Sequence, residues 1–321
     1  WTIGTNNYTI SYEYDAVGNR KKVIYPDQES ISFEHDELGH IVKIPGLFES
    51  QPTSSSGGAG FVYDSVGNLI KTHASNGIDT IYLYNTRNKV VGISSTPLTL
   101  SYAYTGAGNV SSVTDSSLNV SPVTLNYTYD TVGQLKTAQV VRDGVTQTLK
   151  YSYDGANNRI SEELVNGSSQ VIQNYQYSYL PGNYINSKVG QTTVNYSWGN
   201  WGQLTFKSTG EQYVYDSTRS LVSIYDSGNA LASYKYDALG NRIVITEGNT
   251  TTTILSCGND AVYEIIQESG STTVTSKYVV VNGKHLAKVV KEGNGAAQKY
   301  FHHVDLTGSV RAVTNVSGSV V

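Results

Sequence analysis

The sequence predicts an all-β protein, a long spiralling antiparallel sheet of stacked β-hairpins that forms a curved or hollow shell. The first observation behind this prediction is the composition: 321 residues include 26 Tyr, 5 Phe, no Met and 31 Gly. Tyr, Thr, Val and Ile favour strands, whereas Gly, Asn and Asp favour turns. The second is a short motif that recurs along the chain. In addition, no window of the sequence has apolar residues at the spacing of a helix.

The motif reads YEYDAVGNR at Tyr12 and YKYDALGNR at Tyr234. Alignment on an aromatic-x-aromatic step finds eleven copies, spaced 17 to 28 residues apart, which hairpins with variable far-end loops tolerate. The copies begin at Tyr12, Phe33, Phe61, Tyr82, Tyr102, Tyr127, Tyr151, Tyr177, Tyr196, Tyr213 and Tyr234.

The first and third positions of the motif predict a strand with one aromatic face. Side chains two residues apart on a strand point to the same side of the sheet. Packing of this face is the expected main role of the rings, with a binding surface as the alternative. The pairs that define it best are Tyr12 and Tyr14, Tyr127 and Tyr129, and Tyr234 and Tyr236.

The fourth to ninth positions predict a tight turn. The fourth is Asp in seven copies, and its carboxylate can accept backbone N–H groups two residues on. The seventh is Gly in seven copies, Asn in three and Arg once, which indicates a type I turn closed by a left-handed residue. The residues that define this turn are Asp15, Gly18, Asp130, Gly133, Asp237 and Gly240, and Asn241 and Arg242 lead into the return strand.

The expected organisation is a repeat region followed by a cap. Eleven hairpins in series can pair edge to edge into one twisted sheet over residues 1–246. From Ile254 the chain shows longer alternating strands, so residues 247–321 are expected to form a terminal capping segment of the same continuous sheet. The polar stretch Gln51 to Gly60 is expected to be a loop.

The repeated unit resembles the YD repeat of bacterial Rhs and wall-associated proteins, of insecticidal toxin-complex C components and of animal teneurins. A second match is YFHHVDLTGSVRAV, Tyr300 to Val313, which is similar to the terminal signature of that family. Thr307 stands where the family has Leu. The residues that fall on the signature are His303, Asp305, Gly308, Ser309 and Arg311.

The resemblance implies a hollow shell made by a spiralling strip of hairpins. In secreted bacterial members the shell encloses a variable toxic C-terminal domain, which an aspartyl-protease-like segment cuts free. The chain runs from Trp1 to Val321 without such a segment, so a fragment with the role of a wall is expected. The expected function is a non-catalytic, secreted or surface shell or scaffold that encloses or displays a polypeptide such as a C-terminal toxin. The alternatives are an extracellular adhesive or fibre-forming surface protein and, from another class, a carbohydrate-active enzyme.

Composition narrows the partners. A net charge of −4 and a pI near 5.9 argue against nucleic acid, and no apolar run is long enough to span a membrane. Cys257 is the single cysteine, so no intrachain disulfide can form. The expected partners are an enclosed or neighbouring polypeptide, further copies of the chain, and cell-surface glycans, at an extracellular or cell-surface location.

No catalytic, cofactor or metal site is expected. The seven Asp all stand at the turn position, where capping accounts for them without catalysis. His302, His303 and Asp305 could suggest a metal site, but alternation puts only His303 and Asp305 on one face, which favours a structural hydrogen bond. Eight Asn-x-Ser/Thr sequences are candidate glycosylation sites: Asn7, Asn109, Asn119, Asn126, Asn166, Asn195, Asn249 and Asn315.

Overall fold

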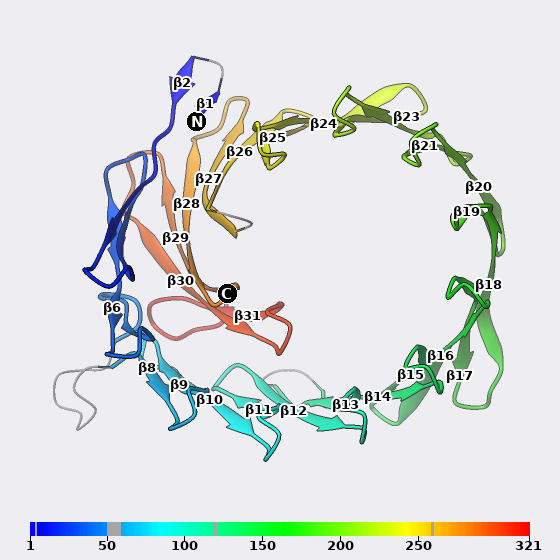
Figure 1. The fold of residues 1–321 in the computed structure, drawn as a ribbon, viewed down its shortest axis with the longest axis horizontal. Helices are drawn as coiled ribbons and strands as arrows, with labels where there is room; N and C mark the ends of the chain where they lie inside the picture. The colour runs from blue at the N-terminus through cyan, green and yellow to red at the C-terminus, as the bar shows by residue number, and fades with distance from the viewer. Residues whose placement is uncertain (4, 50–58, 118–120, 258–259) are drawn as a thin grey trace. The chain divides into compact units, whose positions relative to one another are not determined.

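The computed structural model describes residues 1–321 except 4, 50–58, 118–120 and 258–259. Every regular element of the described residues is a β-strand (Figure 1), so this part of the chain offers no helix that could cross a membrane. The chain separates into two compact units. Unit 1 combines Trp1–Leu100 with Thr252–Val321, and unit 2 is Ser101–Thr251.

Within the described residues, 24 strands, β8 to β31, follow one another as neighbours in one sheet. Three small sheets precede them, with the strand orders β1-β2, β3-β4-β5 and β6-β7. The predicted all-β fold of antiparallel hairpins is therefore confirmed.

The strands of unit 1 come from both ends of the chain. The N-terminal strands are β1 (Thr2–Ile3), β2 (Asn6–Asn7), β3 (Ser11–Tyr14), β4 (Arg20–Ile24), β5 (Ser30–Ser32), β6 (Glu34–His35), β7 (Ile41–Lys43), β8 (Phe61–Tyr63), β9 (Leu69–His73), β10 (Asp79–Tyr84), β11 (Val90–Ser94) and β12 (Thr99–Tyr104). The C-terminal strands are β26 (Thr250–Cys257), β27 (Asp260–Glu268), β28 (Val274–Val281), β29 (Lys284–Glu292), β30 (Gln298–Val304) and β31 (Val310–Thr314). The boundaries between the units fall within β12 and β26.

The strands of unit 2 are consecutive in sequence. They are β13 (Val110–Asp115), β14 (Val123–Tyr129), β15 (Leu135–Arg142), β16 (Val145–Tyr153), β17 (Arg159–Asn166), β18 (Val171–Leu180), β19 (Tyr184–Val189), β20 (Thr193–Trp198), β21 (Leu204–Lys207), β22 (Glu211–Tyr215), β23 (Leu221–Asp226), β24 (Asn229–Tyr236) and β25 (Arg242–Glu247).

The turn of the first repeat shows how the motif builds a hairpin. The backbone N–H of Asp15 donates to the carbonyl of Asn19 at 2.9 Å, and the N–H of Gly18 donates back to the carbonyl of Asp15 at 3.2 Å. The Asp15 carboxylate accepts the backbone N–H groups of Val17 and Asn19. The pairing register shifts at Tyr14, because the turn ends in a β-bulge.

The seventh position of the motif is left-handed throughout. All eleven residues there have φ between +56° and +95°, including Arg219 at +69°. This confirms the turn that was predicted from the exchange of Gly and Asn. The residues are Gly18, Gly39, Gly67, Asn88, Gly108, Gly133, Asn157, Asn183, Gly202, Arg219 and Gly240.

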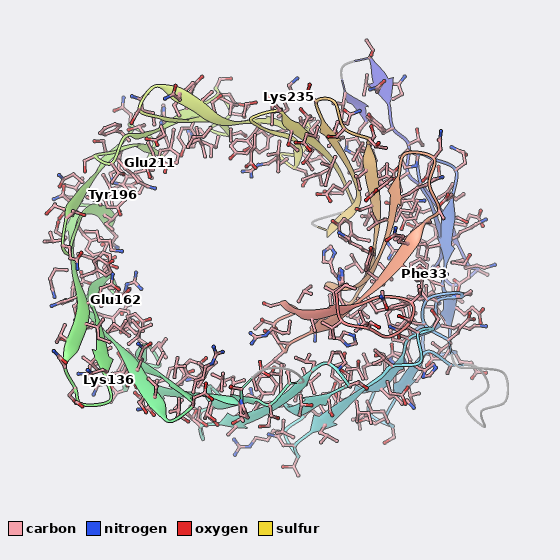
Figure 2. The ribbon with its side chains drawn as sticks, turned by 180° about the vertical axis from the view of Figure 1, so that it is seen from behind. Phe33, Lys136, Glu162, Tyr196, Glu211 and Lys235 are labelled. Carbon is pink, nitrogen blue, oxygen red and sulfur yellow. The ribbon has the colours of Figure 1, made fainter. Side chains whose placement is uncertain are left out.

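Unit 2 by itself is a single layer of hairpins that curves along its length (Figure 1). Figure 2 places Tyr196, Glu162 and Glu211 on the concave side of this layer and Lys235 on the convex side. Since side chains alternate along a strand, the first and third positions of the motif face the concave side and the second faces the convex side.

Unit 1 by itself has two layers. Strands β3 to β7 lie against the face of the C-terminal strands β27 to β30 (Figure 1). Phe33 and Phe48 of the first layer share a buried cluster with Tyr263, Val279 and Phe301 of the second. The rings of Phe48 and Phe301 meet edge to face, with centroids 5.8 Å apart.

The expectation of one continuous sheet does not hold for the first two repeats. The hairpins that begin at Tyr12 and Phe33 lie in the small sheets β3-β4-β5 and β6-β7. Their segments carry apolar residues that the motif does not encode, such as Val23 and Ile31, which are 3% and 8% exposed. These side chains bury one face of the hairpins against the C-terminal strands. The predicted boundary between residues 246 and 247 stays a prediction.

A buried cation ties the two layers of unit 1 together. Lys277 of β28 is 4% exposed, and its ammonium lies 2.6 Å from the Asp27 carboxylate and also contacts Glu29. Lys291 is 3.5 Å from Glu29, so the turn between β4 and β5 supplies both carboxylates to the C-terminal sheet. The hydrogen bond from Lys277 lowers the pKa of Glu29, because it stabilises the ionised carboxylate.

The left-handed turn predicts the effect of a methyl group at Gly240. Its φ is +85°, and a Cβ there would meet no atom within 4 Å, so any cost comes from the backbone alone. We expect Gly240→Ala to lower the free energy of unfolding by about 1 kcal/mol, measured by chemical denaturation.

Gly155→Ala is the matched control. Gly155 also lies in a repeat turn with open space around its Cβ, but its φ is not in the left-handed region. This variant should be neutral or slightly stabilising. Equal losses of stability in the two variants would contradict the left-handed turn as the cause.

Candidate functional site

In seven copies of the motif, the third-position side chain joins its hairpin to the one before it. The hydroxyl of Tyr153 donates to the backbone carbonyl of Leu135 at 2.9 Å, and the carbonyl belongs to the ninth position of the preceding copy. Six further pairs join the same two motif positions, at 2.7 to 3.0 Å: Tyr63 with Ile41, Tyr84 with Leu69, Tyr129 with Val110, Tyr179 with Arg159, Trp198 with Ile185, and Tyr236 with Leu221. This contact requires a side chain that is both long and a donor.

Sequence reasoning assigned these rings to packing and missed their hydrogen bond. The signal was present, because the third position is Tyr, His35 or Trp198 in every copy and never Phe. The first position does accept Phe, at Phe33 and Phe61. The different tolerance for Phe distinguishes a donor position from a packing position.

Several first-position rings of unit 2 lie under a cationic side chain. Tyr151 and Tyr177 lie on β16 and β18, and Arg159 of the intervening strand lies over both rings at 5.5 and 4.9 Å. Strands two apart are roughly 9.6 Å from each other, too far for ring stacking, but a long cationic side chain between them reaches both. Arg242 lies over Tyr234 in the same way, at 4.1 Å.

Arg159 also organises a polar cluster on this face. Its guanidinium is 3.0 Å from the Glu162 carboxylate and donates to the Tyr177 hydroxyl at 3.3 Å. The Tyr177 hydroxyl in turn donates to Glu162. Burial raises the pKa of Tyr177, and the neighbouring Glu162 raises it further, so the hydroxyl stays neutral. The concave face of unit 2 is therefore both aromatic and charged.

Contacts between neighbouring turns explain the non-glycine residues at the seventh position. Each of the three Asn side chains accepts an amide N–H from the eighth position of the preceding copy: Asn88 from Asn68 at 3.4 Å, Asn157 from Gln134 at 3.3 Å, and Asn183 from Asn158 at 3.1 Å. Arg219 lies over the Trp201 ring of the preceding turn at 4.5 Å. These contacts offset part of the cost of a left-handed non-glycine residue.

The Asp carboxylates of the motif accept hydrogen bonds from groups of their own turns. In four copies one carboxylate oxygen accepts two backbone N–H groups and the other accepts the eighth-position Asn amide, as in Asp237 with Asn241 at 2.9 Å. The hydrogen bond from Asn68 lowers the pKa of Asp64, and that from Asn158 lowers the pKa of Asp154. Ionised carboxylates held in this way act as turn caps.

The repeat-defining residues remain in separate hairpins. Tyr12 and Tyr14 lie in β3, Tyr127 and Tyr129 in β14, and Tyr234 and Tyr236 in β24. Tyr14 belongs to the first copy and is 59% exposed. The structure thus distributes these residues along the repeats and does not gather them into one pocket.

The terminal signature forms the same kind of turn between β30 and β31. The Asp305 carboxylate accepts the backbone N–H groups of Thr307 and Ser309, and Gly308 has φ +86°. Thr307, which replaces the family's Leu, adds a hydroxyl donor to Asp305 at 2.7 Å. The guanidinium of Arg311 is 3.9 Å from Asp305.

His303 connects this terminal hairpin to distant turns of unit 1. Its side chain is 3% exposed and shares hydrogen bonds with the hydroxyls of Thr314 at 2.9 Å and Ser95 at 3.3 Å. The Asn76 amide donates to the same Thr314 hydroxyl and to the carbonyl of Asn315. The sequence predicted neither contact, because Ser95 is 208 residues from His303 and Asn76 is 238 residues from Thr314.

Metal binding finds no support in the described part of the chain. His302 points to the carbonyl of His285 at 3.2 Å, and no group of three or more His, Cys, Asp or Glu side chains there could hold an ion. Cys257 ends β26.

The candidate glycosylation sites differ in accessibility. Asn7, Asn195 and Asn249 are exposed, and Asn109 is half-buried in a repeat turn. Asn126 donates to Gln139, while the side-chain oxygens of Asn166 and Asn315 cap turns. Asn119 lies outside the described residues. Glycosylation at any of them stays a prediction.

Comparison with known families agrees with this repeat geometry. The family model "Teneurin YD-shell" matches residues 93–321, more than half of the chain. The chain belongs to the Teneurin YD-shell family.

Curated proteins similar to this YD-shell chain are much longer. It is 27% identical over 199 residues to the tRNA3(Ser)-specific nuclease WapA of Bacillus spizizenii, and 24% identical over 331 residues to Double-stranded DNA deaminase toxin A of Burkholderia cenocepacia. These matches cover 61% and 94% of this chain, but only 7% and 21% of the two relatives.

Solved structures share the YD-shell fold. The Photorhabdus luminescens Tc holotoxin pore matches with a TM-score of 0.77 and 18% identity, over 98% of this chain and 17% of that one. The TcdB2-TccC3-Cdc42 complex matches with the same TM-score at 17% identity, over 98% of this chain and 18% of that one. At this identity the likeness establishes the fold alone.

The hydroxyl-to-carbonyl contact predicts different effects of Tyr→Phe at two positions of one strand. Tyr153→Phe removes the donor to Leu135 and should lower the free energy of unfolding by about 1 kcal/mol. Tyr151→Phe, at the first position of the same copy, keeps the ring under Arg159 and should change it by less than about 0.5 kcal/mol. Chemical denaturation of both variants tests the contact, and equal effects would contradict it.

His303 predicts a loss of stability in mild acid. Burial lowers its pKa from 6.5 to about 4, so the unfolded chain binds a proton below pH 6.5 while the folded chain does not. The free energy of unfolding should therefore fall by about 3 kcal/mol between pH 7 and pH 4 from this residue.

His303→Gln provides the comparison, because Gln can still exchange hydrogen bonds with Thr314 and Ser95 but does not titrate. Denaturation curves at pH 7 and pH 4.5 should show a weaker pH dependence in the variant. The same dependence in both proteins would exclude His303 as its source.

Proposed function

We propose that this chain is a non-catalytic wall segment of a YD-repeat shell whose concave face surrounds or displays another polypeptide. The single observation that carries the proposal is the match of 98% of the chain to Tc toxin structures at a TM-score of 0.77. The named relatives include a nuclease and a deaminase toxin, which supports a polypeptide toxin as the enclosed partner. Their activities belong to the whole relatives, of which this chain corresponds to a small part.

The single-layer structure of unit 2 supports the proposed role as part of a shell wall. Its hairpins form one layer, held by hydroxyl-to-carbonyl bonds and turn contacts that depend on no partner. The concave face presents Tyr rings, Arg159 and Glu162, so it offers ring faces, donors and acceptors to a polypeptide. We place such a shell outside the cell, as a secreted or surface protein.

A second candidate is adhesion at the cell surface, through contacts with other copies or with neighbouring molecules. Three adjacent repeat turns present apolar side chains at their tips, Val17, Leu38 and Val66, which are 83%, 82% and 68% exposed. Apolar side chains so exposed favour an interaction surface at this edge of unit 1.

Site-specific photo-crosslinking tests which face meets the partner. A photoreactive phenylalanine analogue replaces either Tyr234 or its neighbour Lys235 in the natural full-length protein. Lys235 lies on the convex side (Figure 2), so the adjacent side chain of Tyr234 lies on the concave side.

We expect crosslinks from position 234 to polypeptide outside residues 1–321, and few or none from position 235. Crosslinks from position 235 alone would overturn enclosure and favour the adhesive function.

A further inference from the structure

Lys277 lies between two carboxylates in the interior of unit 1. It is 4% exposed, and its ammonium is 2.6 Å from Oδ2 of Asp27 and also contacts Glu29. A nitrogen at this distance from a carboxylate oxygen lies roughly 3 to 4 Å from the carboxyl carbon, close to the separation of about 3 to 3.5 Å from which atoms react. The nucleophile and the carbon of an amide bond are therefore already side by side.

The turn between β4 and β5 holds both carboxylates in place. The backbone N–H of Tyr25 donates to the carbonyl of Glu29 at 2.9 Å, and the N–H of Gln28 donates to the carbonyl of Tyr25 at 2.9 Å. Gln28 is left-handed, with φ +65°, and the ring of Pro26 restricts the first half of the turn. Asp27 and Glu29 thus reach Lys277 from one closed turn.

The two carboxylate oxygens of Asp27 have different surroundings. Oδ2 faces Lys277, whereas Oδ1 accepts the backbone N–H of Glu29 at 3.1 Å. A backbone donor on one oxygen stabilises the negative charge that develops there when an amine attacks the carbon. Oδ2 is then the oxygen that leaves, and Oδ1 becomes the carbonyl oxygen of an amide.

Burial and charge distinguish the roles of Asp27 and Glu29. The side chain of Asp27 is 25% exposed and that of Glu29 is 46% exposed. Glu29 also pairs with Lys291 at 3.5 Å, whereas Lys277 is the one ammonium within ion-pair distance of Asp27 in the described part of the chain. The hydrogen bond from Lys277 lowers the pKa of Glu29, so this carboxylate is ionised and can accept a proton.

Aromatic rings shield the amine from water. Tyr25 and Tyr263 are 2% and 3% exposed, and their rings stack with centroids 5.8 Å apart. The Lys277 nitrogen lies 5.7 Å from the centroid of the Tyr25 ring. A buried ammonium and carboxylate carry a desolvation cost that a neutral amide does not carry. This environment therefore favours an amide over the ion pair.

We propose that Lys277 and Asp27 condense spontaneously to an isopeptide bond, with Glu29 as the proton carrier. Glu29 takes one proton from the ammonium, and the Lys277 nitrogen attacks Cγ of Asp27 to form the C–N bond. Glu29 then returns its proton and the nitrogen gives up a second one, so that Oδ2 leaves as water. An ammonium and a carboxylate are thereby replaced by a neutral amide and one water molecule, and Glu29 is unchanged. The bond joins the turn between β4 and β5 covalently to β28, and it goes beyond the proposed shell function without resting on it.

Peptide mapping by mass spectrometry tests the bond. The natural full-length protein, produced in a bacterial host, is unfolded, reduced and digested with trypsin, which cleaves after unmodified Lys and Arg. We expect a branched species in which residues 23–43 and 243–284 are joined with the loss of one water, because a bonded Lys277 is not cleaved. Fragment spectra should place the branch at Asp27. Separate peptides 23–43 and 243–277 at their sequence masses, or a branch at Glu29, overturn the proposal.

Glu29→Gln tests the proton carrier. The variant keeps Asp27 beside Lys277 but cannot accept a proton at position 29, so the yield of the branched species should fall at least about tenfold. Lys291→Gln is the matched control, because it removes the other cation at Glu29 and leaves the reacting groups in place. Its yield should equal that of the unmodified chain. Equal yields in Glu29→Gln and in the control overturn the role of Glu29.

Discussion

The hydrogen bond from the third-position side chain to a carbonyl of the preceding hairpin is the contact on which the repeat wall depends. Unit 2 is one layer thick, so it cannot bury a core between two sheets, and few of its side chains are fully buried. Backbone ladders hold neighbouring strands, but they leave the twist between hairpins free to vary. A rigid ring that ends in a donor and reaches back one hairpin fixes that relation in the copies that make this contact. This accounts for the absence of Phe from the third position of the motif.

The turns form a second line of contacts along the edge of the sheet. The left-handed residue closes the turn, the Asp carboxylate caps it, and the eighth-position amide joins it to the next turn. Where a side chain replaces glycine at the left-handed position, it contacts the preceding turn, as Asn183 and Arg219 do. Variation at this position of the motif is therefore matched by the neighbouring copy.

The two units meet the need for burial in different ways. Unit 1 folds its first two repeats over the C-terminal strands and buries Phe48, Phe301 and their neighbours between two layers. The ion pairs of Lys277 and the hydrogen bonds of His303 then join segments from opposite ends of the sequence. Unit 2 relies on contacts between sequence neighbours, as other repeat proteins do. A compact two-layer unit and a thin repetitive one can thus be made from the same motif.

The sequence by itself determined what is local. Alternation, the Asp cap and the exchange of Gly for Asn specified the hairpin, its left-handed turn and the all-β fold, because each rests on residues within about ten positions. Only the tertiary structure decided which carbonyl receives the Tyr153 hydroxyl, that the first two repeats leave the sheet, and that His303 meets Ser95 and Thr314. These outcomes depend on which segments pack together across many residues, and a motif that is nearly identical in every copy carries no information about that choice. Burial of the apolar residues that lie between the motifs determined which segments pack together.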